Sequence, residues 1–144
     1  MKVYGLFLVC GVLFLVVGLE PQAQGRRGDK PGESVYSELE KAPAKYLEMR
    51  NPLAEDKDAA IAGGILFEEH CESCHGKEAV GGKKAPSLRA PEVRKARPGA
   101  IFWILSNGIV RKKMPVWSKL PEPERWQLVS YIRALNEEKT ESRK

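Results

Sequence analysis

The segment Cys71-Glu72-Ser73-Cys74-His75 constrains the fold and function of this chain more than any other. Two cysteines at this spacing, followed directly by a histidine, suit only a few kinds of cofactor or metal site. Two thiols three positions apart on a helical turn can each form a thioether with one vinyl group of a porphyrin, and the histidine that follows is then held under the iron. The motif therefore predicts a covalently attached c-type haem, with Cys71 and Cys74 as anchors and His75 as the proximal iron ligand.

Similar cysteine spacings occur in zinc sites and in redox-active dithiols, which are the alternatives to haem. Zinc is usually held by four ligands, and beyond the motif the chain offers only His70 and Cys10 as further histidine or cysteine ligands. Cys10 lies in an apolar segment that we expect to be removed from the mature protein. Because so few ligands remain for zinc, the motif favours haem.

Residues 1–25 are predicted to be an export signal. One base, Lys2, precedes an almost unbroken apolar run at positions 3–19, and the Ala-Gln-Gly sequence at 23–25 fits a cleavage site with small residues. A run of about 17 apolar residues is also at the short end of a membrane span, so an uncleaved anchor is the alternative.

Residues 26–56 are expected to form a flexible tether followed by a surface arm. The tether is rich in glycine and charge, and it has too little apolar surface to order itself. In the arm, Pro43 and Pro52 punctuate scattered apolar residues, which leaves room for one or two short helical turns. The sequence does not decide whether the arm wraps the surface of the domain or is a disordered spacer.

At 144 residues the chain has room for one domain, which we place at residues 57–137, followed by a polar tail at 138–144. Apolar residues recur there at helical spacing, and no strand pattern or internal repeat is visible. The domain is therefore predicted to be all-α, with three to four helices.

The first helix is expected to begin near the acidic residues at 55–58 and to run into the motif. Gly63 and Gly64 inside it disfavour a helix, which suggests that the backbone of another helix approaches closely. A second helix is predicted at 98–107 and a third from 121–124 onward, because each begins at a proline and continues with an apolar face.

A second axial ligand for the iron must come from the face of the ring opposite His75, and the candidates are Met49, His70 and Met114. His70 lies beside the motif, on the same side of the ring as His75. Met114 is favoured because a long loop can carry it to the far face, and Pro115 restricts it to extended conformations. The alternative is that Met114 only fills a gap in the core.

Residues 58–136 resemble a class I cytochrome c domain of the bacterial, exported, monohaem type. The resemblance rests on Gly63, Phe67, the Cys-x-x-Cys-His-Gly run at 71–76, Ala85-Pro86-Ser87-Leu88, Ser106-Asn107-Gly108, Met114-Pro115-Val116-Trp117, and Trp126 with Tyr131-Ile132-Arg133 and Leu135. It implies a small helical fold around one haem c, bound through two thioethers, and it implies a periplasmic location, since such haems are attached outside the cytoplasmic membrane.

The resemblance implies further contacts. The first and last helices are expected to cross at a glycine, so that Gly63 and Phe67 meet Leu128 and Tyr131. The carbonyl of Pro86 is expected to accept the other ring N–H of the proximal histidine and so fix its orientation. Trp103 is expected either to donate its indole N–H to a haem propionate or to pack in the core.

If protein groups fill both axial positions of the iron, no open position remains for bond-making chemistry. The predicted function is therefore that of a periplasmic single-electron carrier and not of an enzyme. The protein would shuttle electrons between a dehydrogenase or quinol-oxidising complex and a terminal acceptor, either as a free carrier or as the electron-accepting subunit of an oxidoreductase. Methionine ligation and an apolar shell predict a positive potential. A haem peroxidase or reductase, or a ligand-binding haem sensor, is the alternative if Met114 does not bind the iron.

The net charge is +5, and positions 77–119 hold eleven bases and two acids, a local balance of +9. The bases are Lys77, Lys83, Lys84, Arg89, Arg94, Lys95, Arg97, Arg111, Lys112, Lys113 and Lys119. They predict a docking face for acidic redox proteins, and a generic solvated surface is the alternative. Nucleic acid is not expected as a partner, because the bases are not interleaved with exposed aromatic residues. Membrane contact is expected only if the N-terminal segment is retained.

Overall fold

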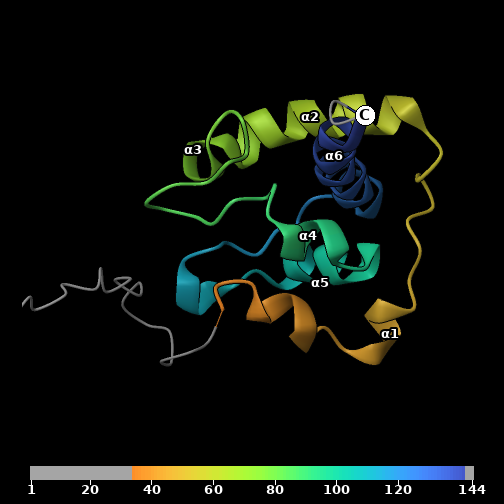
Figure 1. Ribbon diagram of the computed structural model, residues 1–144. Coiled ribbons are helices and arrows are strands. Elements are labelled where there is room, and N and C mark those ends of the chain that lie inside the picture. Colours follow the sequence, from red (N-terminus) through yellow and green to blue (C-terminus); the bar gives the residue numbers. More distant parts are fainter. Residues whose placement is uncertain (1–33, 142–144) are drawn as a thin grey trace, which may run out of the picture.

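The computed structural model describes residues 34–141, and this range is helical, with one isolated antiparallel bridge between Ile109 and Met114 (Figure 1). The elements are η1 (Ser37–Lys41), α1 (Ala44–Leu47), α2 (Lys57–His70), α3 (Glu72–His75), α4 (Pro91–Lys95), α5 (Pro98–Asn107), η2 (Val110–Lys112) and α6 (Glu122–Glu141). The all-α prediction is confirmed. The predicted export signal and tether, up to residue 33, lie outside the described residues.

Helix α2 begins at an aspartate cap. The side chain of Asp56 accepts hydrogen bonds from the backbone N–H groups of Asp58 and Ala59, at 2.9 and 3.2 Å. Such a cap satisfies two of the amide groups that the first turn of a helix leaves without partners. The cap therefore sets the start of the helix within the range predicted from the acidic residues.

Helix α6 crosses α2 in direct backbone contact at Gly63 (Figure 1). A Cβ atom at position 63 would lie 2.0 Å from the carbonyl oxygen of Gln127 and 2.9 Å from Cβ of Tyr131. One turn further along α2, the rings of Phe67 and Tyr131 have centroids 5.2 Å apart. The predicted crossing at a glycine is confirmed, although Gly63 meets Gln127 rather than its neighbour Leu128.

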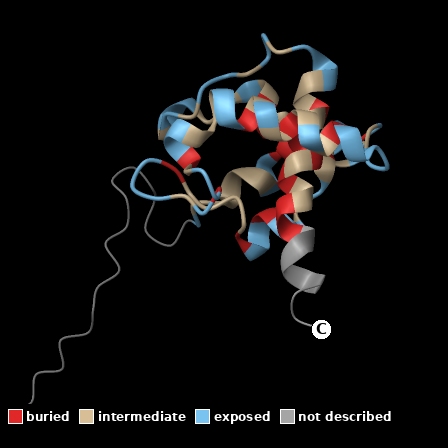
Figure 2. Ribbon diagram, turned by 90° about the horizontal axis from the view of Figure 1, so that it is seen from above, coloured by how far each residue is buried: buried red, intermediate tan, exposed pale blue. Residues whose placement is uncertain are grey.

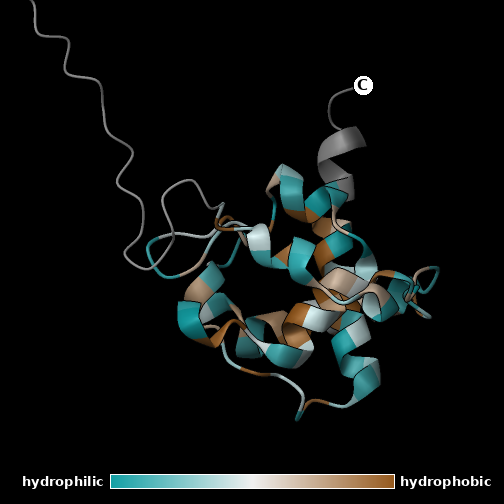
Figure 3. Ribbon diagram, turned by 90° about the horizontal axis from the view of Figure 1, so that it is seen from below, coloured by the Kyte–Doolittle hydropathy of each residue, from teal (hydrophilic) through white to brown (hydrophobic). Residues whose placement is uncertain are grey.

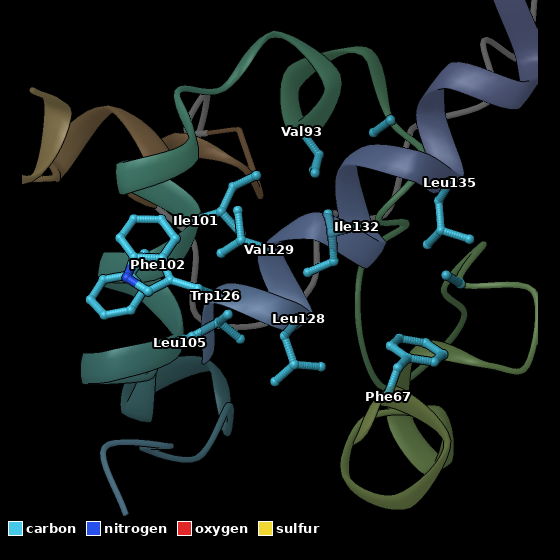
Figure 4. Close-up of a cluster of buried hydrophobic side chains, with 12 residues drawn as sticks. Phe67, Val93, Ile101, Phe102, Leu105, Trp126, Leu128, Val129, Ile132 and Leu135 are labelled. Carbon is cyan, nitrogen blue, oxygen red and sulfur yellow. The ribbon is translucent and has the colours of Figure 1, made fainter. Parts of the chain in front are cut away.

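The hydrophobic core lies where α2, α5 and α6 meet (Figures 2 and 4). Phe67, Leu128 and Val129 are its largest fully buried side chains, and the rings of Phe102 and Trp126 stack with centroids 4.1 Å apart. Helix α5 has the predicted bounds and is buried at six of its ten positions. A helix that is apolar on nearly all sides needs neighbours on all sides, and α5 packs against α6 and against the arm elements η1 and α1.

The N-terminal arm covers the side of α5 that faces away from α2 (Figure 1). The ring of Tyr46 lies 6.5 Å from that of Phe102, centroid to centroid. A Cβ atom at Gly99 would lie 1.8 Å from the carbonyl oxygen of Tyr46, so the arm touches the α5 backbone itself. The sequence left the course of the arm open, and in the structure it packs against the domain.

Side-chain hydrogen bonds attach the end of the arm to α6. The amide of Asn51, which is 8% exposed, donates to the hydroxyl of Ser130 at 2.8 Å and to the carbonyl of Trp126 at 3.3 Å. Its oxygen accepts from the backbone N–H of Leu53 at 2.9 Å. If the arm moved away from α6, this buried amide would lose its hydrogen-bond partners. The hydrogen bonds of Asn51 therefore stabilise the packed position of the arm.

Two elements differ from the prediction. Helix α6 continues to Glu141, so the start of the expected polar tail is helical, and the Glu- and Lys-rich sequence there contains no helix breaker. The short helix α4 was not predicted, although Pro91 at its first turn is a start signal.

Hydrophilic and hydrophobic residues alternate along most of the helices (Figure 3). The exposed large apolar side chains include Ile61 and Ile65 on α2, which are 66% and 64% exposed, and Val110 at the hairpin, which is 72% exposed. Val80 and Val116 are exposed as well. None of the helices within residues 34–141 combines the length and apolar character needed to cross a membrane.

We predict that Gly63→Ala lowers the free energy of unfolding by about 2 kcal/mol, because the new methyl group overlaps the Gln127 carbonyl. This overlap outweighs the gain of about 1 kcal/mol that alanine brings to a helix over glycine. Gly82→Ala is the matched control, since a Cβ atom there meets nothing within 4 Å. Denaturant unfolding measures both, and equal stabilities for the two variants would contradict the close contact.

Candidate haem site

The Cys-x-x-Cys-His motif forms the helical turn in which α2 ends. The amide of Cys71 donates to the carbonyl of Phe67 at 2.8 Å, and that of His75 donates to the carbonyl of Cys71 at 2.9 Å. Both thiols are free; Cys71 is partly buried and Cys74 is exposed. The turn therefore brings together the three residues that the motif predicts as haem anchors and proximal ligand.

The ring of His75 is buried, at 9% exposure, and its Nδ1 lies 3.0 Å from the carbonyl oxygen of Pro86. Because a carbonyl can only accept, Nδ1 carries the proton and Nε2 keeps its lone pair. Burial lowers the pKa of His75, and the bond to Pro86 opposes this effect without cancelling it. The result is a neutral, oriented imidazole with one nitrogen available to a metal.

The loop that carries Pro86 is held at both of its ends. The amide of Leu88 donates to the carbonyl of Ala79 at 2.8 Å, which closes the loop. The guanidinium of Arg89 donates to the carbonyls of Glu78 at 2.7 Å and of Leu135 at 2.8 Å. Sequence reasoning counted Arg89 only as part of a basic surface, and no local pattern would have revealed that it joins this loop to α6.

Met114 closes a small hairpin that follows α5. The amide of Ile109 donates to the carbonyl of Met114 at 3.0 Å, and the reverse bond measures 3.2 Å. Lys113, just before it, has a left-handed backbone with φ of 64°. The side chain of Met114 is partly buried against the core. The amide of Trp117 donates to the carbonyl of Leu105 at 2.9 Å, which ties the following segment back to α5.

The other candidate ligands have different surroundings. The ring of His70 lies against that of Trp117, with centroids 5.2 Å apart. Met49 lies on the arm, where its Cβ is 3.1 Å from the Cβ position of Gly99, and it lines a hollow of about 370 Å³ with Lys45, Tyr46, Phe102, Glu122 and Arg125. Trp103 is partly exposed and does not belong to the core cluster.

The donor set fits a haem better than a redox dithiol. Burial, together with the neighbouring Cys74, raises the pKa of Cys71 to about 11, whereas redox-active dithiols have a cysteine with a lowered pKa. Two free thiols on one turn beside an oriented imidazole are the groups that a covalent haem requires. Among the described residues, no three His, Cys, Asp or Glu side chains are arranged to hold a metal ion.

Residues 58–132 match the family described as cytochrome c oxidase, cbb3-type, subunit III. The chain belongs to this cytochrome c family. Its membership confirms the predicted class I c-type cytochrome domain, and the family implies a haem c as cofactor.

The cytochrome is also 32% identical, over 118 residues, to the quinohemoprotein alcohol dehydrogenase ADH-IIG of Pseudomonas putida. That alignment covers 79% of this chain but only 15% of the relative, so the chain spans a small part of the relative's length. The arm up to residue 56 precedes the region matched by the family, although it packs against α5 and α6.

Proposed function

We propose that the protein is a periplasmic single-electron carrier, with a haem c attached through Cys71 and Cys74 and ligated by His75 and Met114. The observation that carries this proposal is the bond between His75 Nδ1 and Pro86, because it leaves Nε2 of a buried, neutral ring as the metal-binding nitrogen. A haem bound there supplies reversible one-electron oxidation and reduction of its iron.

Each residue of the site has a distinct part in this proposal. Pro86 orients the imidazole and increases its basicity, since the carbonyl accepts the opposite N–H. Met114 offers a soft thioether from a hairpin packed on the core, which favours the reduced state and raises the potential. Trp103, with a partly exposed side chain, would donate its indole N–H to a propionate.

If His75 and Met114 both bound the iron, no position would remain for a substrate, and electron transfer is the chemistry that the haem would supply. The relative is an alcohol dehydrogenase that contains a similar stretch of sequence, which supports a dehydrogenase as electron donor. A quinol-oxidising complex is the other donor that we propose. The cytochrome would then pass single electrons to a terminal acceptor, either as a free carrier or as a subunit.

The eleven bases at positions 77–119 differ in what they contact. Arg89 and Arg97 donate to backbone carbonyls and Arg111 pairs with Glu38, so these arginines contribute to the fold. Five exposed lysines lie in the motif loop and around the Met114 hairpin: Lys77, Lys83, Lys84, Lys113 and Lys119. Of these, Lys84 also donates to the carbonyl of Ser73 at 3.3 Å. We propose these lysines as the docking face for an acidic redox partner, in a weak encounter that salt would screen.

We predict that Met114→Ala removes the weak red absorption band of ferric iron bound to methionine sulfur. The potential should fall by on the order of 0.1 V, because the axial ligand is a main determinant of haem potential. Met49→Ala is the matched control and should leave both unchanged. Visible spectra and redox titration of the exported protein measure the effects.

An unchanged spectrum in Met114→Ala would reassign the sixth ligand. A high-spin ferric spectrum with rapid peroxide reaction in the wild type would favour a haem enzyme, and ready binding of carbon monoxide without catalysis would favour a sensor. Intact mass reports covalent haem and removal of the leader at the same time. A colourless exported protein with zinc bound would reject the proposal.

Docking through the lysines predicts that reduction by an acidic donor protein slows as ionic strength rises. The double variant Lys77→Glu/Lys83→Glu should slow reduction about tenfold at low salt, because steering charge is lost. The control Lys45→Glu/Lys57→Glu changes the same charge at exposed positions away from the motif. Stopped-flow rates that are independent of salt, or equal in the two variants, would rule out this docking face.

A further inference from the structure

The 3-10 helix η1 of the arm contains a carboxylate that is held between two cations. The guanidinium of Arg111 pairs with Oε1 of Glu38, and Nζ of Lys41 donates to the same oxygen at 2.8 Å. The side chain of Glu38 is 12% exposed, whereas those of Arg111 and Lys41 are 43% and 50% exposed. The acid is thus largely covered, and its partners reach it from the surface.

Glu38 is ionised in this position. Burial of the carboxyl opposes ionisation, but the hydrogen bonds and charges of Lys41 and Arg111 outweigh that effect and lower its pKa. A hydrogen bond between charged partners is stronger than one between neutral groups, and partial burial reduces screening by salt. The contact between Glu38 and Arg111 is therefore a charge-assisted hydrogen bond that joins the arm to the hairpin.

Arg111 belongs to the turn of the hairpin that Met114 closes. It lies in η2, between Ile109 and Met114, whose backbones exchange two hydrogen bonds. The hairpin is short, so a restraint on its turn restrains the position of Met114. In Figure 1, η1 lies beside this hairpin, on the side away from α2.

The same segment of the arm also reaches the loop that orients His75. The hydroxyl of Tyr36 donates to the carbonyl of Ser87 at 3.1 Å, and Ser87 follows Pro86 directly. Residues 36–41 therefore contact both the loop that orients His75 and the hairpin that carries Met114.

We propose that residues 36–41 form a strap that positions both loops: Glu38 holds the Met114 hairpin through Arg111, and Tyr36 holds the Pro86 segment through the carbonyl of Ser87. The inference rests on the proposed haem ligation. The strap precedes the region matched by the family, at residues 58–132, so it adds a positioning element to the domain.

The strap predicts that Glu38→Gln loosens the Met114 hairpin. In the haem-containing protein, the amides of Ile109 and Met114 should exchange with deuterium about fivefold faster, as expected for loss of a partly buried ion pair. Added imidazole should displace the methionine ligand faster than in the wild type, by a similar factor. Loss of the red absorption band measures this displacement rate. The control is Glu40→Gln, an exposed acid in the same helix, and it should match the wild type.

Tyr36→Phe tests the other end of the strap. It should accelerate exchange of the Leu88 amide, which donates across the Pro86 loop, by about threefold and leave Ile109 and Met114 unchanged. Arg111→Gln should likewise accelerate exchange at Ile109 and Met114, and adding Glu38→Gln to it should change these two amides little further. The contact that Glu38→Gln removes in addition, with Lys41, lies within η1 and not on the hairpin.

Equal exchange and ligand-displacement rates in Glu38→Gln and Glu40→Gln would overturn the strap. So would uniform acceleration that includes core amides such as Val129, since this would indicate general destabilisation. Absence of the red band in the wild type would instead reject Met114 ligation. In that case amide exchange still decides whether Glu38 holds the hairpin.

Discussion

The packing of α2 against α6 is the contact on which the rest of the structure depends. With no side chain at Gly63, the α6 backbone at Gln127 approaches α2 directly, and Phe67 is buried against Tyr131 one turn later. This contact sets the direction in which α2 leaves the core. It therefore sets where the Cys-x-x-Cys-His turn lies, because that turn continues the same helix.

Loops carry the other groups of the candidate site, and backbone carbonyls hold many of them in place. Pro86 accepts from His75, Ser87 accepts from Tyr36, and Glu78 accepts from Arg89. A carbonyl acceptor survives almost any substitution of its own side chain. The geometry therefore depends on a few donors, and two of them, Tyr36 and Arg89, lie outside the haem motif.

The arm has a physical reason to be part of the domain. Helix α5 is apolar on nearly all sides, so it needs cover on the side that α2 and α6 leave open. Tyr46 provides this cover, and the approach of its backbone requires glycine at position 99. Once the arm is placed there, its first turn lies within reach of the Met114 hairpin, and this permits the contact between Glu38 and Arg111.

The sequence by itself determined the features that depend on local chemistry: the spacing of the motif, the helix starts at Asp56 and Pro98, and a glycine at the helix crossing. Only the tertiary structure decided the course of the arm, the joining role of Arg89 and the pairing of Glu38 with Arg111. These contacts link residues 46 to 79 positions apart, and no periodicity or short motif encodes them. They form because the apolar helix α5 is buried by the arm, and this packing places polar side chains of the arm, such as Glu38, beside partners that are distant in sequence.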